Sequence, residues 1–240
     1  FLKNLSLGTI ALATAGSFAD SIIRTASEAF ARELMSTPSQ TEGPFYPNRL
    51  PLDTDNDLVL ISNSMTPAAG EITHLTGRVL GQTGEPVEDA VVEIWHVDSK
   101  GIYLHTSCPN RDQLDRNFQG YGRTITTSSG EYSFRTIKPV PYDLGVKRTP
   151  HIHFIIRKGD KRFLTTQMYI KGHPMNKEDF IFQRIQGEEA REAVLVDFKP
   201  VNLSKNSELK ANFDIVIGIT PEESSKDLFR HHDGHPVENL

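Results

Sequence analysis

The fold is decided by the stretch His151-Ile-His-Phe-Ile-Ile-Arg-Lys-Gly-Asp-Lys-Arg-Phe-Leu-Thr-Thr-Gln-Met-Tyr-Ile170. Two runs rich in Ile, Thr and aromatic residues flank the polar tetrapeptide Lys158-Gly-Asp-Lys161. β-Branched and aromatic residues favour strands, whereas Gly and Asp favour a tight turn. The sequence therefore predicts two strands, His151–Arg157 and Phe163–Ile170, joined by a short turn.

Similar runs recur through the chain and are bounded by turn residues, such as Gly81-Gln-Thr-Gly-Glu-Pro86 and Ser128-Ser-Gly130. The other predicted strands are Ile72–Leu80, Ala90–Val97, Tyr121–Thr127, Tyr132–Ile137, Ala193–Phe198 and Ala211–Ile217. No convincing helix separates these runs, so alternating βα units are not expected. The pattern predicts an all-β fold, an antiparallel β-sandwich of two sheets, preceded by a helical and extended amino-terminal segment.

Three regions are predicted along the chain: an amino-terminal segment of residues 1–40, one β-sandwich domain of residues 41–220, and a polar tail of residues 221–240. The spacing of apolar residues predicts a helix from Ser21 to Met35 in the first region. The tail contains three histidines, which are more typical of a solvated segment than of a metal site.

The first residues bear on the cellular location of the protein. The apolar stretch from Leu5 to Gly16 is shorter than the roughly 20 residues that span a bilayer. Small residues precede Asp20, where a signal peptidase could cut. The start of the chain resembles the end of a twin-arginine export signal, which implies a periplasmic or exported protein. The alternative is an ordinary helix of a cytoplasmic protein, and both remain open.

Composition excludes several classes of function. The 240 residues are sufficient for one substantial core, and the net charge of −5 gives no general attraction to nucleic acid or anionic membranes. Cys108 is the only cysteine, so an internal disulfide framework and multi-cysteine metal sites are excluded. Any metal must be bound by histidine, carboxylate or tyrosine side chains.

His151 and His153 are separated by one residue in a predicted strand, so their imidazoles project from the same face. Arg148 and Pro150 precede the pair and place a fixed positive charge beside it. A His-x-His pair alone fits solvent-exposed strand residues as well as metal ligands.

Two tyrosines add to the pair. Tyr142 ends the proline-stiffened segment Lys138-Pro-Val-Pro-Tyr142, and Tyr103 directly follows Gly101-Ile102. Phenolate is an anionic oxygen ligand that favours iron(III). Two phenols and two imidazoles therefore form a set of oxygen and nitrogen ligands suited to a hard trivalent ion.

Several stretches of the chain, in order, carry a family likeness. They are Thr41-Glu-Gly-Pro-Phe-Tyr-Pro47, Gly84-Glu-Pro-Val87, Val92-Glu-Ile-Trp-His96, Gly101-Ile-Tyr103, Phe118-Gln-Gly-Tyr-Gly-Arg123, Gly130-Glu-Tyr-Ser-Phe-Arg-Thr-Ile-Lys-Pro139 and Arg148-Thr-Pro-His-Ile-His-Phe154. Together they resemble the intradiol ring-cleavage dioxygenases, and among these most nearly the protocatechuate 3,4-dioxygenase group. The resemblance runs from about residue 40 to residue 175.

This resemblance implies a mononuclear non-haem iron(III) enzyme that uses O2 to open the ring of a catechol-type diol, giving a cis,cis-muconate-type product. It implies that the metal ligands are Tyr103, Tyr142, His151 and His153, with Tyr103 as the ligand that leaves the metal when the diol binds. It also implies a homo-oligomer or a pair of related chains.

The same resemblance assigns the neighbouring residues. Arg148 matches an arginine that stabilises negative charge on the substrate ring, and Gln167 matches a glutamine near the reacting face. Trp95 matches a tryptophan close to the substrate. Leu144 stands where protocatechuate enzymes have tryptophan, and the interval from Tyr142 to His151 is shorter than usual, so the substrate substituent is left open.

Two other functions fit the same pattern. A zinc hydrolase would combine the His-x-His pair with a third histidine, such as His96 or His173, and would leave both tyrosines without a role. A transthyretin-like binding module would need no metal at all, because sandwiches carry many functions.

Overall fold

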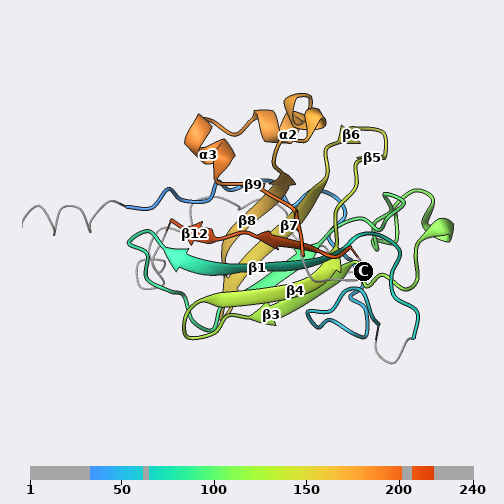
Figure 1. Ribbon diagram of the computed structural model, residues 1–240, viewed down its shortest axis with the longest axis horizontal. Coiled ribbons are helices and arrows are strands. Elements are labelled where there is room, and N and C mark those ends of the chain that lie inside the picture. Colours follow the sequence, from blue (N-terminus) through green and yellow to red (C-terminus); the bar gives the residue numbers. More distant parts are fainter. Residues whose placement is uncertain (1–32, 62–64, 202–206, 219–240) are drawn as a thin grey trace, which may run out of the picture. The chain divides into compact units, whose positions relative to one another are not determined.

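Two five-stranded sheets make up the β-sandwich of the computed structural model, which describes residues 33–61, 65–201 and 207–218 (Figure 1). The first sheet has β1 at its centre, with β4 along one edge and the other strands along the opposite edge. Its strands are β10 (Lys199–Pro200), β11 (Leu209–Asn212), β1 (Ile72–Gly81), β12 (Ile215–Ile217) and β4 (Glu131–Ile137). The second sheet has the order β3 (Tyr121–Ile125), β2 (Val91–Trp95), β7 (His151–Lys158), β8 (Lys161–Ile170) and β9 (Leu195–Val196).

The core lies between these sheets. Alternate residues of β4 are buried, as expected for a strand with one face in the core. In β7, the first six residues are all buried. Ile152, Phe154 and Ile156 belong to the main core, while His151 and His153 are buried on the opposite face. The strand is therefore covered on both sides, and one side is available for a buried polar site.

The prediction of a mostly β fold is confirmed, but the prediction of wholly antiparallel sheets is wrong. β1 pairs in parallel with β11 and β12, and β8 pairs in parallel with β9. The chain between β8 and β9 forms the short helices α2 (Phe180–Gln183) and α3 (Glu188–Glu192). This helical connection lets the chain re-enter the sheet in the same direction. Two 3₁₀ helices, η1 (Arg111–Gln113) and η2 (Pro174–Lys177), and the two-stranded ribbon β5 (Tyr142–Asp143) and β6 (Lys147–Arg148) complete the described elements.

The last predicted strand is divided in two where Phe213 meets β1. Phe213 N donates to Thr76 O at 2.8 Å, and Tyr132 Oη donates to Phe213 O. A Cβ added at Gly77 would lie 2.0 Å from Phe213 O. The bare backbone of Gly77 is therefore what allows this close approach.

We expect Gly77→Ala to lower the free energy of unfolding by about 1–3 kcal/mol, because the new methyl group must displace backbone. Denaturant titration would measure the change. Ser133→Ala, an exposed position on the neighbouring strand β4, should stay within about 0.5 kcal/mol of the parent. Equal stability of Gly77→Ala and the parent would contradict the close contact.

The segment before the sandwich is extended along both sheets. Thr37 N donates to Val216 O at 2.9 Å and Gln40 N donates to Thr165 O at 2.8 Å. The described residues from Leu34 to Gly218 belong to one unit. The predicted helix from Ser21 to Met35 lies almost wholly outside the described residues, and its last three residues, which are described, are not helical. The proposed export signal and the tail of residues 221–240 also lie outside them.

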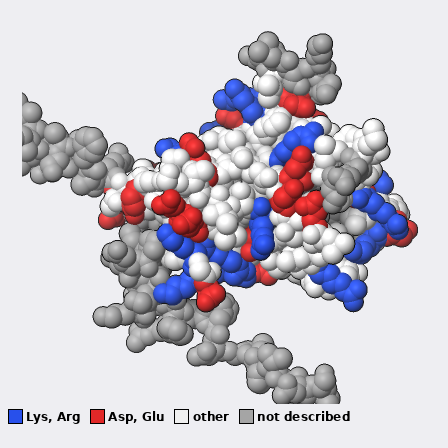
Figure 2. Space-filling view, turned by 90° about the horizontal axis from the view of Figure 1, so that it is seen from below, with Lys and Arg blue, Asp and Glu red and all other residues white. Residues whose placement is uncertain are grey.

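On the face that Figure 2 shows, basic and acidic side chains are interspersed, so it offers no broad basic area. Within the described ranges, the helices are too short to cross a bilayer.

Candidate metal centre

Four side chains predicted to bind metal meet at one point. The hydroxyl oxygen of Tyr103 lies 3.3 Å from that of Tyr142, 3.3 Å from His151 Nε2 and 3.1 Å from His153 Nε2. The two Nε2 atoms are 3.1 Å apart. The structure therefore brings together residues that are up to 50 positions apart in the sequence.

A different local structure positions each of these side chains: a strand, a two-stranded ribbon and a turn. His151 and His153 alternate with core residues along β7. The ribbon of β5 and β6 carries Tyr142. Tyr103 follows a turn in which Asp98 Oδ1 accepts hydrogen bonds from the backbone N–H groups of Lys100 and Ile102 at 2.9 and 3.0 Å. The turn brings Tyr103 from a loop to the face of the sheet.

Gly101, in that turn, is required by the neighbouring ribbon. Its φ is +81°, in the left-handed region, and a Cβ there would lie 3.0 Å from Tyr142 Cβ. The glycine that the sequence places two residues before Tyr103 thus makes room for the second tyrosine.

Burial sets the protonation of these groups. It lowers the pKa of His151 to about 3 and that of His153 well below its ordinary value, so both imidazoles are neutral. Neutral imidazole is the form that binds a metal. Burial also raises the pKa of Tyr103 well above its ordinary value, and raises that of Tyr142. The phenols need a bound cation to ionise near neutral pH.

The two histidines are oriented by different contacts. His151 Nδ1 lies 2.7 Å from Thr149 O, so a backbone carbonyl fixes its ring and leaves Nε2 free for the centre. His153 Nδ1 is buried without a hydrogen-bond partner among the described residues. Its ring is stacked on Trp95, with centroids 4.6 Å apart and planes 10° apart. Trp95, which the family resemblance places close to the substrate, is fully buried against this ligand candidate.

Arg148 and Gln167 lie beside the four donors and contact each other. Arg148 Nη2 donates to Gln167 Oε1 at 2.7 Å, and Arg148 Nε donates to Asp179 Oδ2 at 2.8 Å. The pairing of β5 with β6 sets Arg148 directly opposite Tyr142. Leu144, in the loop of this ribbon, is partly buried against the hydrophobic cluster that contains Tyr103.

Asp179 was not singled out from the sequence. Its position before Phe180-Ile-Phe-Gln183 fits a helix N-cap, which is a local signal that predicts nothing about Arg148. The contact between them joins residues 31 positions apart, so only the folded chain reveals it.

Three further histidines lie away from this point. His96 is buried, with Nε2 2.7 Å from Thr136 Oγ1, and His105 is only partly buried, with Nδ1 2.8 Å from Ser107 Oγ. His173 Nδ1 lies 3.2 Å from Thr149 Oγ1. Across residues 33–61, 65–201 and 207–218, no three His, Cys, Asp or Glu side chains are grouped to bind an ion. A zinc centre with a third histidine therefore has no support in this part of the chain.

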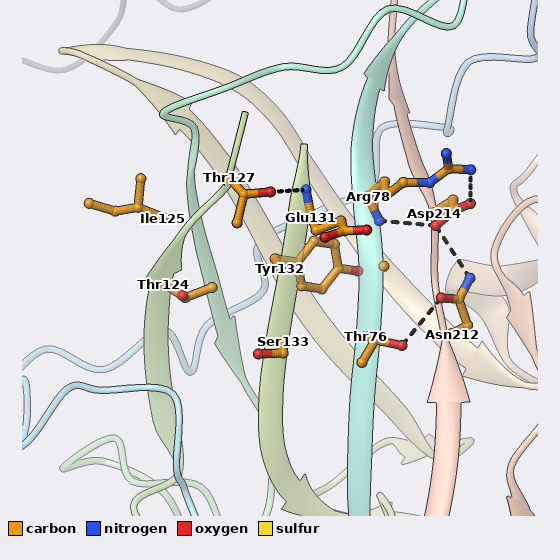
Figure 3. A pocket seen from close by; sticks show the side chains of 11 residues that line it. Thr76, Arg78, Thr124, Ile125, Thr127, Glu131, Tyr132, Ser133, Asn212 and Asp214 are labelled. Atoms are coloured by element: carbon orange, nitrogen blue, oxygen red, sulfur yellow. Dashed lines mark hydrogen bonds and ion pairs between the residues drawn. The ribbon is translucent and has the colours of Figure 1, made fainter. Parts of the chain in front are cut away.

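A hollow of about 610 Å³ lies on the exposed face of β1 and β4 (Figure 3). Its polar lining includes Arg78 and Asp214, which form an ion pair with 3.2 Å between Nη2 and Oδ2. The hydroxyl of Tyr132 there is already bonded to Phe213 O. None of the four donor residues lines this hollow, so it is separate from the candidate metal centre.

Known proteins with similar sequences are dioxygenases. A family model described as "Dioxygenase" matches residues 41–218. The protocatechuate 3,4-dioxygenase beta chain of Burkholderia cepacia is 38% identical over 173 residues, covering 70% of this chain and 72% of that protein. Catechol 1,2-dioxygenase 1 of Acinetobacter lwoffii is 34% identical over 170 residues, covering 61% of this chain and 50% of that protein. The chain thus spans about half the length of the latter relative.

Solved structures share the fold. The dioxygenase domain of a carbohydrate-binding fusion protein from Streptomyces sp. SirexAA-E has a TM-score of 0.58 and 26% identity, covering 78% of this chain and 100% of that domain. Catechol 1,2-dioxygenase from Acinetobacter sp. ADP1 has a TM-score of 0.59 and 24% identity, covering 86% of this chain and 70% of that one.

The protein is a β-sandwich in which two phenols and two imidazoles meet at one buried point. Together with the family match over residues 41–218, these features place the protein in the class of the dioxygenases. The chain belongs to the intradiol ring-cleavage dioxygenase family, a family of oxidoreductases.

Proposed function

We propose that this chain binds one iron(III) ion and uses O2 to cleave a catechol-type diol between its hydroxyl-bearing carbons, giving a cis,cis-muconate-type product. The observation that carries the proposal is the meeting of four donor atoms: Tyr142 Oη, His151 Nε2 and His153 Nε2 lie 3.1–3.3 Å from Tyr103 Oη, and the two Nε2 atoms are 3.1 Å apart. Two ligands that each lie about 2.0–2.1 Å from one ion are roughly 3 Å apart.

The chemistry of the donors favours iron(III) over zinc. Two phenolate oxygens suit a hard trivalent ion, and imidazole binds iron as well as zinc. A structural zinc site typically uses cysteine and histidine, and a catalytic one uses three protein ligands that include no phenolate. Iron(III), when bound, would act as a Lewis acid toward the diol oxygens and position the diol for reaction with O2.

The residues around the ion have separate roles in this proposal. His151 and His153 supply neutral nitrogens, each oriented by its own contact. Tyr103 Oη and Tyr142 Oη supply oxygens, and on binding of the diol, Tyr103 Oη would take one of its protons. Arg148 supplies a fixed positive charge near the developing negative charge of the ring, where a preoriented cation has its largest effect. Gln167 fixes that guanidinium.

The approach of the diol is proposed to lie on the side of Tyr142. Tyr103, His151 and His153 are all at most 3% exposed, whereas Tyr142 is only partly buried. Leu144 lies two residues after Tyr142 in the same ribbon, so we assign it to recognition of the ring, and Trp95 to an indirect role through the His153 ring on which it is stacked. The relatives act, by name, on protocatechuate, catechol, chlorocatechol and hydroxyquinol, and a homo-oligomer remains part of the proposal.

The proposal is tested with purified protein loaded with iron. We expect one iron per chain and a broad visible band from phenolate-to-iron charge transfer. Oxygen consumption should follow addition of catechol, protocatechuate or hydroxyquinol, with identification of the ring-opened product. A colourless protein fully loaded with zinc would rule out the iron centre, and a coloured protein inert toward all three diols would rule out the reaction.

A further inference from the structure

Asp179 is a buried carboxylate bound on every side. Its Oδ2 accepts hydrogen bonds from Arg148 Nε at 2.8 Å and from Thr149 N at 3.0 Å. Its Oδ1 accepts from Ile181 N at 3.1 Å and from Phe182 N at 3.0 Å. The side chain has 0% exposure, while that of Arg148 has 8%. Three backbone N–H groups thus fix the carboxylate independently of the arginine.

The guanidinium of Arg148 is in turn fixed at two of its nitrogens. Asp179 binds Nε and Gln167 Oε1 binds Nη2, and the ring of Phe180 lies 5.6 Å from the guanidinium carbon. Gln167 is itself held, because its Nε2 donates to Thr41 O at 2.9 Å. Arginine has many rotamers, so two directional bonds to fixed partners remove most of its freedom.

This arrangement determines where the positive charge lies. β6 pairs with β5 so that Arg148 is directly opposite Tyr142, whose hydroxyl lies 3.3 Å from that of Tyr103. Figure 1 shows the β5 and β6 ribbon beside α2, the helix that Asp179 caps, at the same end of the second sheet. Asp179 therefore links the start of α2 to the arginine next to the metal centre.

We infer that Asp179 is a positioning residue for the reaction, because it orients the Arg148 guanidinium beside Tyr142 and so acts on catalysis through Arg148. The inference rests on the proposed function of this site. In a purely structural role, Asp179 would serve only as the N-cap of α2, and its ion pair with Arg148 would have no effect on turnover.

Two substitutions of Asp179 distinguish its role as the N-cap of α2 from its role in the ion pair with Arg148. Asp179→Asn and Asp179→Ser both keep a side-chain oxygen that can accept from the amides at the start of α2. Neither keeps the negative charge that binds Arg148. We expect both variants to bind iron and show the visible band of the parent, while kcat falls about 10- to 100-fold, the usual effect of removing an outer-shell partner. The KM for the diol should change much less.

The chain offers a matched control in Asp57. Its Oδ1 accepts from the backbone N–H groups of Val59 and Leu60 at 3.0 and 3.2 Å, and it pairs with Arg135 at 3.0 Å. Asp57→Asn therefore removes the charge from a second carboxylate that accepts from two backbone N–H groups and pairs with arginine, although its side chain is 34% exposed. We expect the kcat of this variant to stay within about twofold of the parent value, since a substitution at a partly exposed position away from the four donor residues has only a small effect.

A double-mutant cycle distinguishes action through Arg148 from a separate effect on folding. In an Arg148→Gln background, Asp179→Asn should reduce kcat by less than twofold more, because residues acting as one unit are not additive. Multiplicative losses, an unchanged kcat in both single variants, or failure of both to fold would each overturn the inference. Absence of iron and of the visible band in the parent would instead refute the proposed function.

Discussion

Replacement of His153 by alanine or of Tyr142 by phenylalanine is expected to remove the visible band and turnover together. Each change deletes one atom of the cluster that meets at Tyr103 Oη. Changes to outer-shell partners alone reduce metal affinity or activity about 10- to 100-fold, so loss of a ligand should exceed 100-fold in kcat. Iron content, the absorption spectrum and oxygen uptake would be measured on the same samples.

Histidines outside the cluster supply the controls. His105→Ala changes a partly buried residue whose Nδ1 contacts Ser107, and His96→Ala changes a buried one that contacts Thr136 rather than the centre. Both variants should keep the colour, although His96→Ala should be less stable because it opens a cavity. Retention of full colour in His153→Ala or Tyr142→Phe would show the ligand assignment to be wrong.

Trp95→Ala is expected to weaken both the fold and the metal centre. The indole is fully buried, and deletion of a buried aromatic side chain reduces the free energy of unfolding by about 3–5 kcal/mol. Because the ring of His153 is stacked on this indole and its Nδ1 has no partner in the described part of the chain, the imidazole should also lose its orientation. Denaturant titration and iron affinity would measure the two effects.

Phe154→Ala separates these effects. Phe154 follows His153 on β7 but faces the main core, where its ring contacts that of Phe213 with centroids 5.0 Å apart. This variant should lose a similar 3–5 kcal/mol of stability while it keeps its iron affinity. Trp95→Phe, which keeps an aromatic surface for stacking, should be intermediate. Equal loss of iron in Trp95→Ala and Phe154→Ala would contradict a specific role for the stacked pair.

Local pattern was sufficient to predict the central strands. β7 and β8 coincide closely with the predicted runs, because both their residue types and the turn at Lys158-Gly-Asp-Lys161 are short-range signals. The parallel pairings of β1 with β11 and of β8 with β9 were not predictable in this way. They depend on which distant segments meet, and a run of apolar residues does not encode its partner.

The convergence of the four predicted ligands was expected from family resemblance, and the geometry agrees with it. Spacing along the chain alone supported only the alternation of His151 and His153. Asp179 escaped notice since a capping aspartate looks the same whether or not an arginine meets it. The contribution of Trp95 to the orientation of His153 likewise required the pairing of β2 with β7, which sets the two residues opposite each other.

Because both sides of β7 are buried, this strand should not tolerate insertions or deletions in its sequence. A shift of β7 by one residue would exchange the sides, directing the imidazoles into the apolar interior and Ile152 and Phe154 toward the candidate metal centre. Activity and folding would then be lost in a single step. Insertions within this strand should therefore be excluded, whereas lengthening of the exposed turn at Gly159 should be tolerated, so variation among homologues is expected to accumulate at that turn.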